Sequence, residues 1–104
     1  MSNEQAVIVR STLTQHESDV LFPQLEALEN ELISTINAVG LGEFDGNEIG
    51  GGELVLYMYG PDAERLFVAV APVLRRSALT RGGIASIRPG PPGAKDRSVH
   101  LSAH

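Results

Sequence analysis

Hydrophobic residues recur at helical spacing in two stretches of the chain. The first stretch advances in steps of three or four residues and comprises Leu21, Leu25, Leu28, Leu32, Ile36 and Val39. Residues at this spacing lie on one face of a helix, and Gly40 follows as a typical C-terminal cap. The pattern therefore predicts a helix with Pro23 in its first turn and its end at Gly40.

A second helix is predicted from the segment Gly60-Pro61-Asp62 onwards. Pro61 suits the first helical position, and Asp62 favours the positive end of the helix dipole. The apolar stripe of this helix comprises Leu66, Phe67, Val70, Val73 and Leu74. Because Pro72 falls within that stripe, we expect a kink or an early end there.

Four segments have the composition of strands, namely Ala6–Leu13, Leu41–Ile49, Glu53–Tyr59 and Ile84–Arg88. In the third of them Leu54, Leu56 and Met58 alternate with Val55, Tyr57 and Tyr59. Alternate residues of a strand point to opposite sides of a sheet, so the two sets occupy different faces. Gly50–Gly52 predicts a hairpin loop. Val99–Leu101 is either a short extension or an edge strand.

The predicted elements follow the order strand, helix, strand, strand, helix, strand. This order is typical of a ferredoxin-like βαββαβ plait, an α+β fold whose antiparallel sheet carries both helices on one face. An open α/β unit with a different strand order is the alternative. Since 104 residues suffice for one two-layer core, we expect a single domain over residues 1–104.

Composition narrows the class of partner. A formal charge of -5 opposes binding to nucleic acid or to an anionic membrane, and no apolar run is long enough to span a bilayer. Arg75, Arg76 and Arg81 are a candidate basic patch, but we interpret Arg75 and Arg76 as complements of a helix dipole. The start MSNEQAVIVR lacks a secretory pattern and the chain has no cysteine, so we expect a cytoplasmic protein.

Two segments of the chain resemble parts of small bacterial proteins of unknown function. One is GEFDGNEIGGG followed by LVLYMYGPDAERLF, which is similar to their acidic DG-x-E turn, glycines and Tyr-Gly-Pro-Asp-Ala segment; the other is IRPGPPGAKDRSVHL. The layout is also distantly similar to the ribonuclease E inhibitor B family. The resemblance implies a ferredoxin-like fold and carries no assigned activity.

Candidate metal ligands are concentrated between Glu43 and Glu48. Asp45-Gly46-Asn47 resembles the start of an EF-hand loop, but the twelfth position is Leu56 inside a strand, which excludes that motif. Glu43, Asp45, Asn47 and Glu48 could supply oxygen ligands to a loose cation site, although such residues are more typical of a solvated edge strand. We therefore predict no metal and no cofactor.

Catalytic patterns are weak throughout the chain. His16, His100 and His104 form no spaced pair of zinc ligands, and no serine lies in a G-x-S-x-G pattern. We therefore predict a protein that is not an enzyme. An enzyme that depends on Asp45 or Glu48 is a further hypothesis, and replacing either residue by alanine would abolish its activity.

The favoured site is the sheet face opposite the helices. Strand alternation places Ile8 and Arg10 on this face beside Val55, Tyr57 and Tyr59. Tyrosine and arginine are frequent anchors of binding surfaces, although tyrosines also simply cover open sheets. We predict a homodimer or a protein partner, bound through this face and an adjacent acidic edge that comprise Arg10, Tyr57, Tyr59, Asp45, Asn47 and Glu48.

A small-ligand-binding regulatory domain is the alternative function. Its pocket would lie between the Gly50–Gly52 loop, the helix start at Gly60–Asp62 and the turn Pro89–Gly93. Helix N-termini favour anions, whereas the carboxylates of Asp62 and Glu64 oppose one here.

Overall fold

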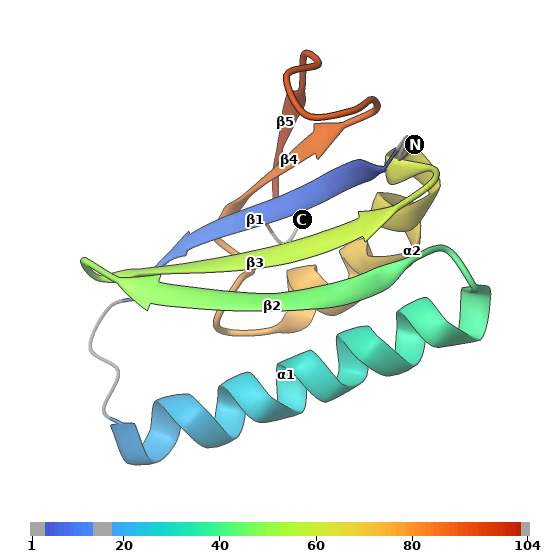
Figure 1. Ribbon diagram of the computed structural model, residues 1–104. Helices are drawn as coiled ribbons and strands as arrows, with labels where there is room; N and C mark the ends of the chain where they lie inside the picture. The colour runs from blue at the N-terminus through green and yellow to red at the C-terminus, as the bar shows by residue number, and fades with distance from the viewer. Residues whose placement is uncertain (1–3, 14–17, 103–104) are drawn as a thin grey trace.

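The computed structural model describes residues 4–13 and 18–102. Its strands are β1 (Gln5–Thr12), β2 (Glu43–Gly50), β3 (Glu53–Gly60), β4 (Ile84–Arg88) and β5 (Arg97–His100), and its helices are α1 (Ser18–Val39) and α2 (Ala63–Arg76). The strands form one antiparallel sheet in the order β2-β3-β1-β4-β5 (Figure 1). The predicted α+β class is confirmed as an open five-stranded antiparallel sheet with two helices.

The segment near the C-terminal end, predicted as either a short extension or an edge strand, forms a fifth strand. β5 pairs with β4, so this segment is an edge strand, displaced from the predicted Val99–Leu101 to Arg97–His100. Leu101 follows the strand, is fully buried in the core and donates its backbone N–H to the carbonyl of Gly83 at 2.9 Å. Burial of this leucine fixes the end of β5 against the rest of the domain.

Both helices pack on one face of the sheet. The sheet side of the core consists of alternate residues of the three central strands, Val7, Val9, Leu54, Leu56, Met58, Ala85 and Ile87. The predicted helical stripes supply the other side, since Leu21 to Ile36 in α1 and Leu66 to Leu74 in α2 are buried at the predicted positions. Val39 is the exception, because it is 49% exposed at the end of α1.

Neither helix begins where its proline predicts: α1 begins earlier than expected and α2 begins later. α1 begins at Ser18, so Pro23 lies inside the helix and not in its first turn. In α2 the N-cap is Asp62, whose Oδ1 accepts the backbone N–H of Arg65 at 3.1 Å, and Pro61 therefore precedes the helix. The Asp62 side chain satisfies a helical N–H, which a proline side chain cannot do, and the first helical residue is Ala63, two positions later than predicted.

Helix α2 does not end at Pro72 but continues to Arg76. A proline inside a helix leaves the carbonyl four residues earlier, here that of Val68, without its helical donor. Pro72 and Val68 both lie on the exposed side of α2, where water can satisfy that carbonyl. The interruption is therefore tolerated at this position.

Glycines determine the chain path at both ends of β3. Gly51 and Gly52 have φ values of 59° and 78° and are the central residues of the β2–β3 hairpin, as a type I′ turn requires. At the other end of β3, a Cβ on Gly60 would lie 2.1 Å from the carbonyl oxygen of Leu41. Only a residue without a side chain allows that close approach.

Candidate binding surface on the open sheet face

Strand pairing arranges the open face in four rows that cross the sheet. The first row reads Glu43, Tyr59, Ala6 and Arg88. The second reads Gly46, Tyr57, Ile8, Ser86 and Ser98, and the third reads Glu48, Val55, Arg10, Ile84 and His100. The fourth reads Gly50, Glu53 and Thr12. Paired residues of neighbouring strands point to the same side of a sheet. The predicted grouping of Arg10, Tyr57 and Tyr59 on the face opposite Leu56 is therefore confirmed.

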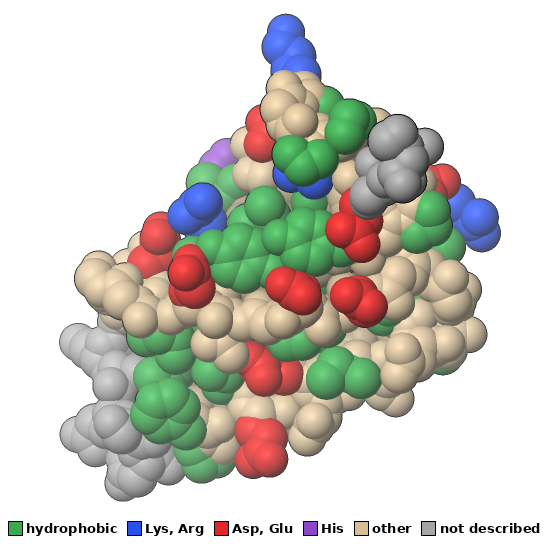
Figure 2. All heavy atoms as spheres, in the orientation of Figure 1, with side chains coloured by type: hydrophobic (Ala, Val, Ile, Leu, Met, Phe, Trp, Pro, Cys, Tyr) green, Lys and Arg blue, Asp and Glu red, His purple; other side chains and the backbone are tan. Residues whose placement is uncertain are grey.

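The centre of this face is apolar and aromatic. Ile8, Tyr57 and Tyr59 are half-buried, whereas Ala6 and Val55 on the same face are 0% and 6% exposed. Val55 was expected on the surface and is instead covered by its neighbours. Figure 2 shows this face as a continuous hydrophobic patch with carboxylates along its β2 border. At the centre of the face the accessible apolar surface therefore comes mainly from the two tyrosines and Ile8.

Tyr57 is linked to the edge strand by a side-chain hydrogen bond. Its hydroxyl donates to Oε1 of Glu48 at 2.6 Å. This hydrogen bond, with smaller contributions from desolvation and the Glu48 charge, raises the pKa of Tyr57 above its ordinary value of 10.0. The phenol therefore keeps its proton and acts as a donor over the physiological pH range.

Charge is distributed unevenly across the face. Glu43 and Glu48 lie on β2, whereas Arg10 lies on β1 and Arg88 on β4. Arg10 also forms an ion pair with Glu53 at 3.7 Å, in which both side chains are about half exposed (56% and 46%). The face therefore has an acidic β2 side and arginines toward β4.

Arg88 is oriented by two backbone carbonyls. Its Nε donates to the carbonyl of Gly90 at 3.0 Å, and one terminal nitrogen donates to the carbonyl of Glu4 at 3.4 Å. Arg88 is not among the site residues predicted from the sequence. Alternation along Ile84–Arg88 could have done so, because Ile84, Ser86 and Arg88 share one face of that strand.

The predicted acidic edge is not a single surface. Asn47 pairs with Leu56 on the helix side of the sheet, and its amide nitrogen donates to a carboxylate oxygen of Glu29 in α1. Glu48 points to the open face instead. Asp45 lies at a shift in register between Phe44 and Gly46, where it has no pairing residue on β3. Alternation and this bulge therefore separate the three predicted residues.

No metal centre is formed by the residues that the structure describes. Among residues 4–13 and 18–102, no group of three or more His, Asp or Glu side chains is placed to hold a metal ion. His100 is exposed on β5, and His16 and His104 lie outside the described residues.

The ligand pocket predicted from three loops is not assembled. Gly50–Gly52 and Gly60–Asp62 lie at opposite ends of β3, so they cannot line one pocket. The turn after Arg88 does lie at the Gly60 end, because Arg88 pairs with Ala6 and Gly60 with Gln5. An open depression of about 480 Å³ at this end is lined by Glu4, Gly40, Gly42, Glu43, Tyr59, Gly60 and Pro61.

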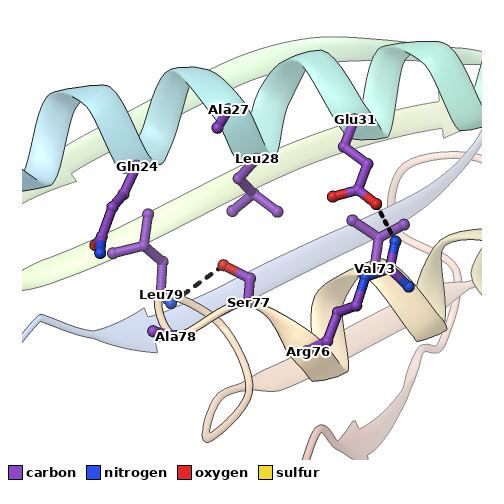
Figure 3. Close-up of a pocket in the computed structure, with 9 residues that line it drawn as sticks. All are labelled: Gln24, Ala27, Leu28, Glu31, Val73, Arg76, Ser77, Ala78 and Leu79. Atoms are coloured by element: carbon purple, nitrogen blue, oxygen red, sulfur yellow. Dashed lines mark hydrogen bonds and ion pairs between the residues drawn. The ribbon is translucent and has the colours of Figure 1, made fainter.

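A smaller groove of about 270 Å³ lies between the two helices. Figure 3 shows Leu28, Val73 and Leu79 converging in it, with the ion pair between Glu31 and Arg76 across one end. Arg76 was interpreted as a complement to the α2 dipole, and its position in the last turn of α2 is confirmed. Its partner is distant in sequence and was not predicted. The groove falls just below the usual range of ligand pockets, roughly 300–1,000 Å³.

Comparisons of the chain with protein-family models, with curated proteins and with solved structures found no match. The resemblance to small bacterial proteins and to the ribonuclease E inhibitor B family therefore stays a prediction. In the described part of the chain, no helix is both long and apolar enough to cross a membrane.

Proposed function

We propose that this protein is a non-enzymatic cytoplasmic regulator that binds protein through its open sheet face, and that its partner is a second copy of itself. The fold proposed for it is a ferredoxin-like plait extended by one strand. Support for the plait comes from the strand order β2-β3-β1-β4 and from both helices packing on one face.

The observation that carries this proposal is the position of Tyr57, Tyr59 and Ile8. These side chains occupy adjacent positions on the two strands at the centre of the open face, with Arg10 beside them. Tyrosine and arginine provide much of the binding energy at protein interfaces, because each combines a large apolar contact with a polar group. A second copy is the simplest partner, since two-fold homodimers are the commonest oligomers.

A binding role also agrees with the contacts that two carboxylates make on this face. Glu48 accepts the hydroxyl of Tyr57, and Glu53 pairs with the guanidinium of Arg10. Glu48 and Glu53 thus each have a stabilising partner, and the two do not form a coupled acid and base. The contacts orient side chains for recognition rather than for proton transfer.

Replacing Tyr57 tests the proposal. Tyr57→Glu places a negative charge at the centre of the face beside Glu48, and we expect it to convert a dimer into a monomer by light scattering. The matched control is Val68→Glu, which introduces the same charge at a residue that is 72% exposed on α2. The control should remain dimeric. A Tyr57→Glu variant with the mass of the wild type would place the contact elsewhere.

A further inference from the structure

Two charged rows of the open face define how a second copy can pack. The first row has Glu43 at its β2 end and Arg88 at its β4 end, and the third has Glu48 on β2 and Arg10 on β1. Both of these rows therefore change from acidic to basic in the same direction across the sheet, whereas the second row has no charged residue. In an interface between two identical faces, each row of one copy must face either the same row or a different row of the other copy.

We propose that two copies pack face to face about a two-fold axis that runs along the strands, between β1 and β3, so that Glu43 of each copy meets Arg88 of the other. This inference rests on the proposed function, because it describes the packing of the same face. Rotation about this two-fold axis keeps each residue at the same position along the strand direction and reverses the order of the strands across the sheet. It therefore sets β2 of one copy against β4 of the other, and β3 against β1.

Charge selects this axis over its alternative. A two-fold axis across the strands would keep the strand order and set the first row against the third. Glu43 of one copy would then face Glu48 of the other, and like charges that face each other across an interface are unfavourable. The axis along the strands instead gives two Glu43–Arg88 pairs and moves each Glu48 toward the β1–β4 side of the second copy, where Arg10 and Ile84 lie.

Side-chain size agrees with the same axis. Tyr59 lies in the row of Ala6, and Tyr57 lies in the row of Ile8. Reversal of the strand order sets each tyrosine of one copy against the smaller residue of that row in the other copy. Large residues that meet small ones let two sheets interdigitate at the roughly 10 Å spacing of packed sheets. An arrangement of tyrosine against tyrosine would hold the sheets further apart.

Complementary charge reversal tests the pairing. Glu43→Arg alone gives two Arg–Arg contacts in a homodimer, and Arg88→Glu alone gives two Glu–Glu contacts, so each variant should dissociate at least about tenfold more readily than the wild type. In an equimolar mixture, both contacts of the mixed dimer are again Glu–Arg. We expect that mixture to regain the wild-type dimer mass. Glu26→Arg, an equal charge change on the exposed side of α1, should leave the dimer intact.

A second measurement reports the proximity of the two positions directly. The chain contains no cysteine, so Glu43→Cys and Arg88→Cys each introduce a single thiol. Under oxidising conditions we expect the mixture of these two variants to form disulfide-linked dimers faster than either variant alone. Equal rates in all three samples would overturn the proposed axis.

The outcomes separate this inference from the function on which it rests. A wild-type chain that is monomeric at all concentrations would refute both proposals. A dimer that Tyr57→Glu dissociates, but that neither mixture of variants restores or cross-links, would refute only the axis. Restored mass in the charge-reversal mixture together with preferential cross-linking would support both.

Discussion

The hydroxyl of Tyr57 donates a 2.6 Å hydrogen bond to Oε1 of Glu48, and this contact joins the edge strand β2 to the centre of the open face. Because Glu48 pairs with Val55 and Tyr57 with Gly46, the bond runs diagonally between neighbouring strands. Such diagonal contacts are within reach of an aromatic side chain. The bond holds the ring of Tyr57 in one orientation on the surface that we propose for binding.

The first prediction concerns the ionisation of Tyr57. The hydrogen bond to Glu48 raises the pKa of this phenol above 10.0, so it should release its proton at a higher pH than a tyrosine in the unfolded chain. In a Tyr59→Phe background, where Tyr57 is the only tyrosine, the absorbance of the phenolate reports this titration. Glu48→Gln should shift the titration to lower pH.

A stability change must accompany that titration. A group whose pKa is raised on folding contributes stability below its unfolded pKa, and that contribution is lost as the pH rises through the folded value. The free energy of unfolding of the wild type should therefore decrease above pH 10, and that of Tyr57→Phe should decrease less. Identical alkaline profiles for the two proteins would show that the hydrogen bond does not persist in solution.

The second prediction concerns the anchor between the β4–β5 hairpin and α2. Arg97 donates from Nε and a terminal nitrogen to both carboxylate oxygens of Glu64, at 2.8 and 2.5 Å. This bidentate contact lowers the pKa of Glu64 below its ordinary value of 4.5. Because the folded pKa is lowered, the contribution to stability is present above the unfolded pKa and is lost as the pH falls through the folded value.

Glu64→Gln tests that anchor. We expect the variant to melt at a lower temperature than the wild type at neutral pH, and the two melting temperatures to converge at acidic pH, where Glu64 is protonated. Arg65 on the exposed side of α2 has no assigned salt bridge among the described residues, so Arg65→Gln is a suitable control. A difference between wild type and Glu64→Gln that persists at low pH would indicate a cause other than the ion pair.

Sequence patterns predicted the parts of the fold that depend on burial. The helical stripes from Leu21 to Ile36 and from Leu66 to Leu74 form the core because their spacing places them on one side of each helix. Alternation in Glu53–Tyr59 likewise separated the core face from the open face. These patterns are local and strongly coupled to burial, so they survive in the folded protein.

Other features depend on pairings that no local pattern specifies. Glu31 and Arg76 are 45 residues apart, and the side chain of Gln5 accepts the N–H of Ala63 from 58 residues away. The bulge at Asp45 shifts the register of β2, so that Glu43 and Glu48 lie on the same face although five residues separate them. Exposed polar residues carry little periodicity, so the rows of the binding surface became visible only once the strand register was known.

The third prediction concerns the contact between Gly60 and the chain that leaves α1. A Cβ on Gly60 would lie 2.1 Å from the carbonyl oxygen of Leu41, and that backbone atom cannot move as a flexible side chain would. Gly60→Ala should therefore destabilise the protein by roughly 2–3 kcal/mol, as overpacking does. Chemical denaturation measures this change.

Gly50→Ala provides the matched control for that change. A Cβ on Gly50 would have no heavy atom within 4 Å, and Gly50 does not have a left-handed φ. Its replacement should alter the free energy of unfolding by less than about 1 kcal/mol. Equal destabilisation by the two substitutions would point to a general intolerance of alanine in these strands instead of a clash at Gly60.

The central claim is that the open sheet face binds a second copy of this chain. Light scattering of the purified protein over a concentration series tests it most directly. We predict a mass of twice 11.1 kDa at high concentration that falls toward 11.1 kDa on dilution. A mass of 11.1 kDa at every concentration would contradict the claim.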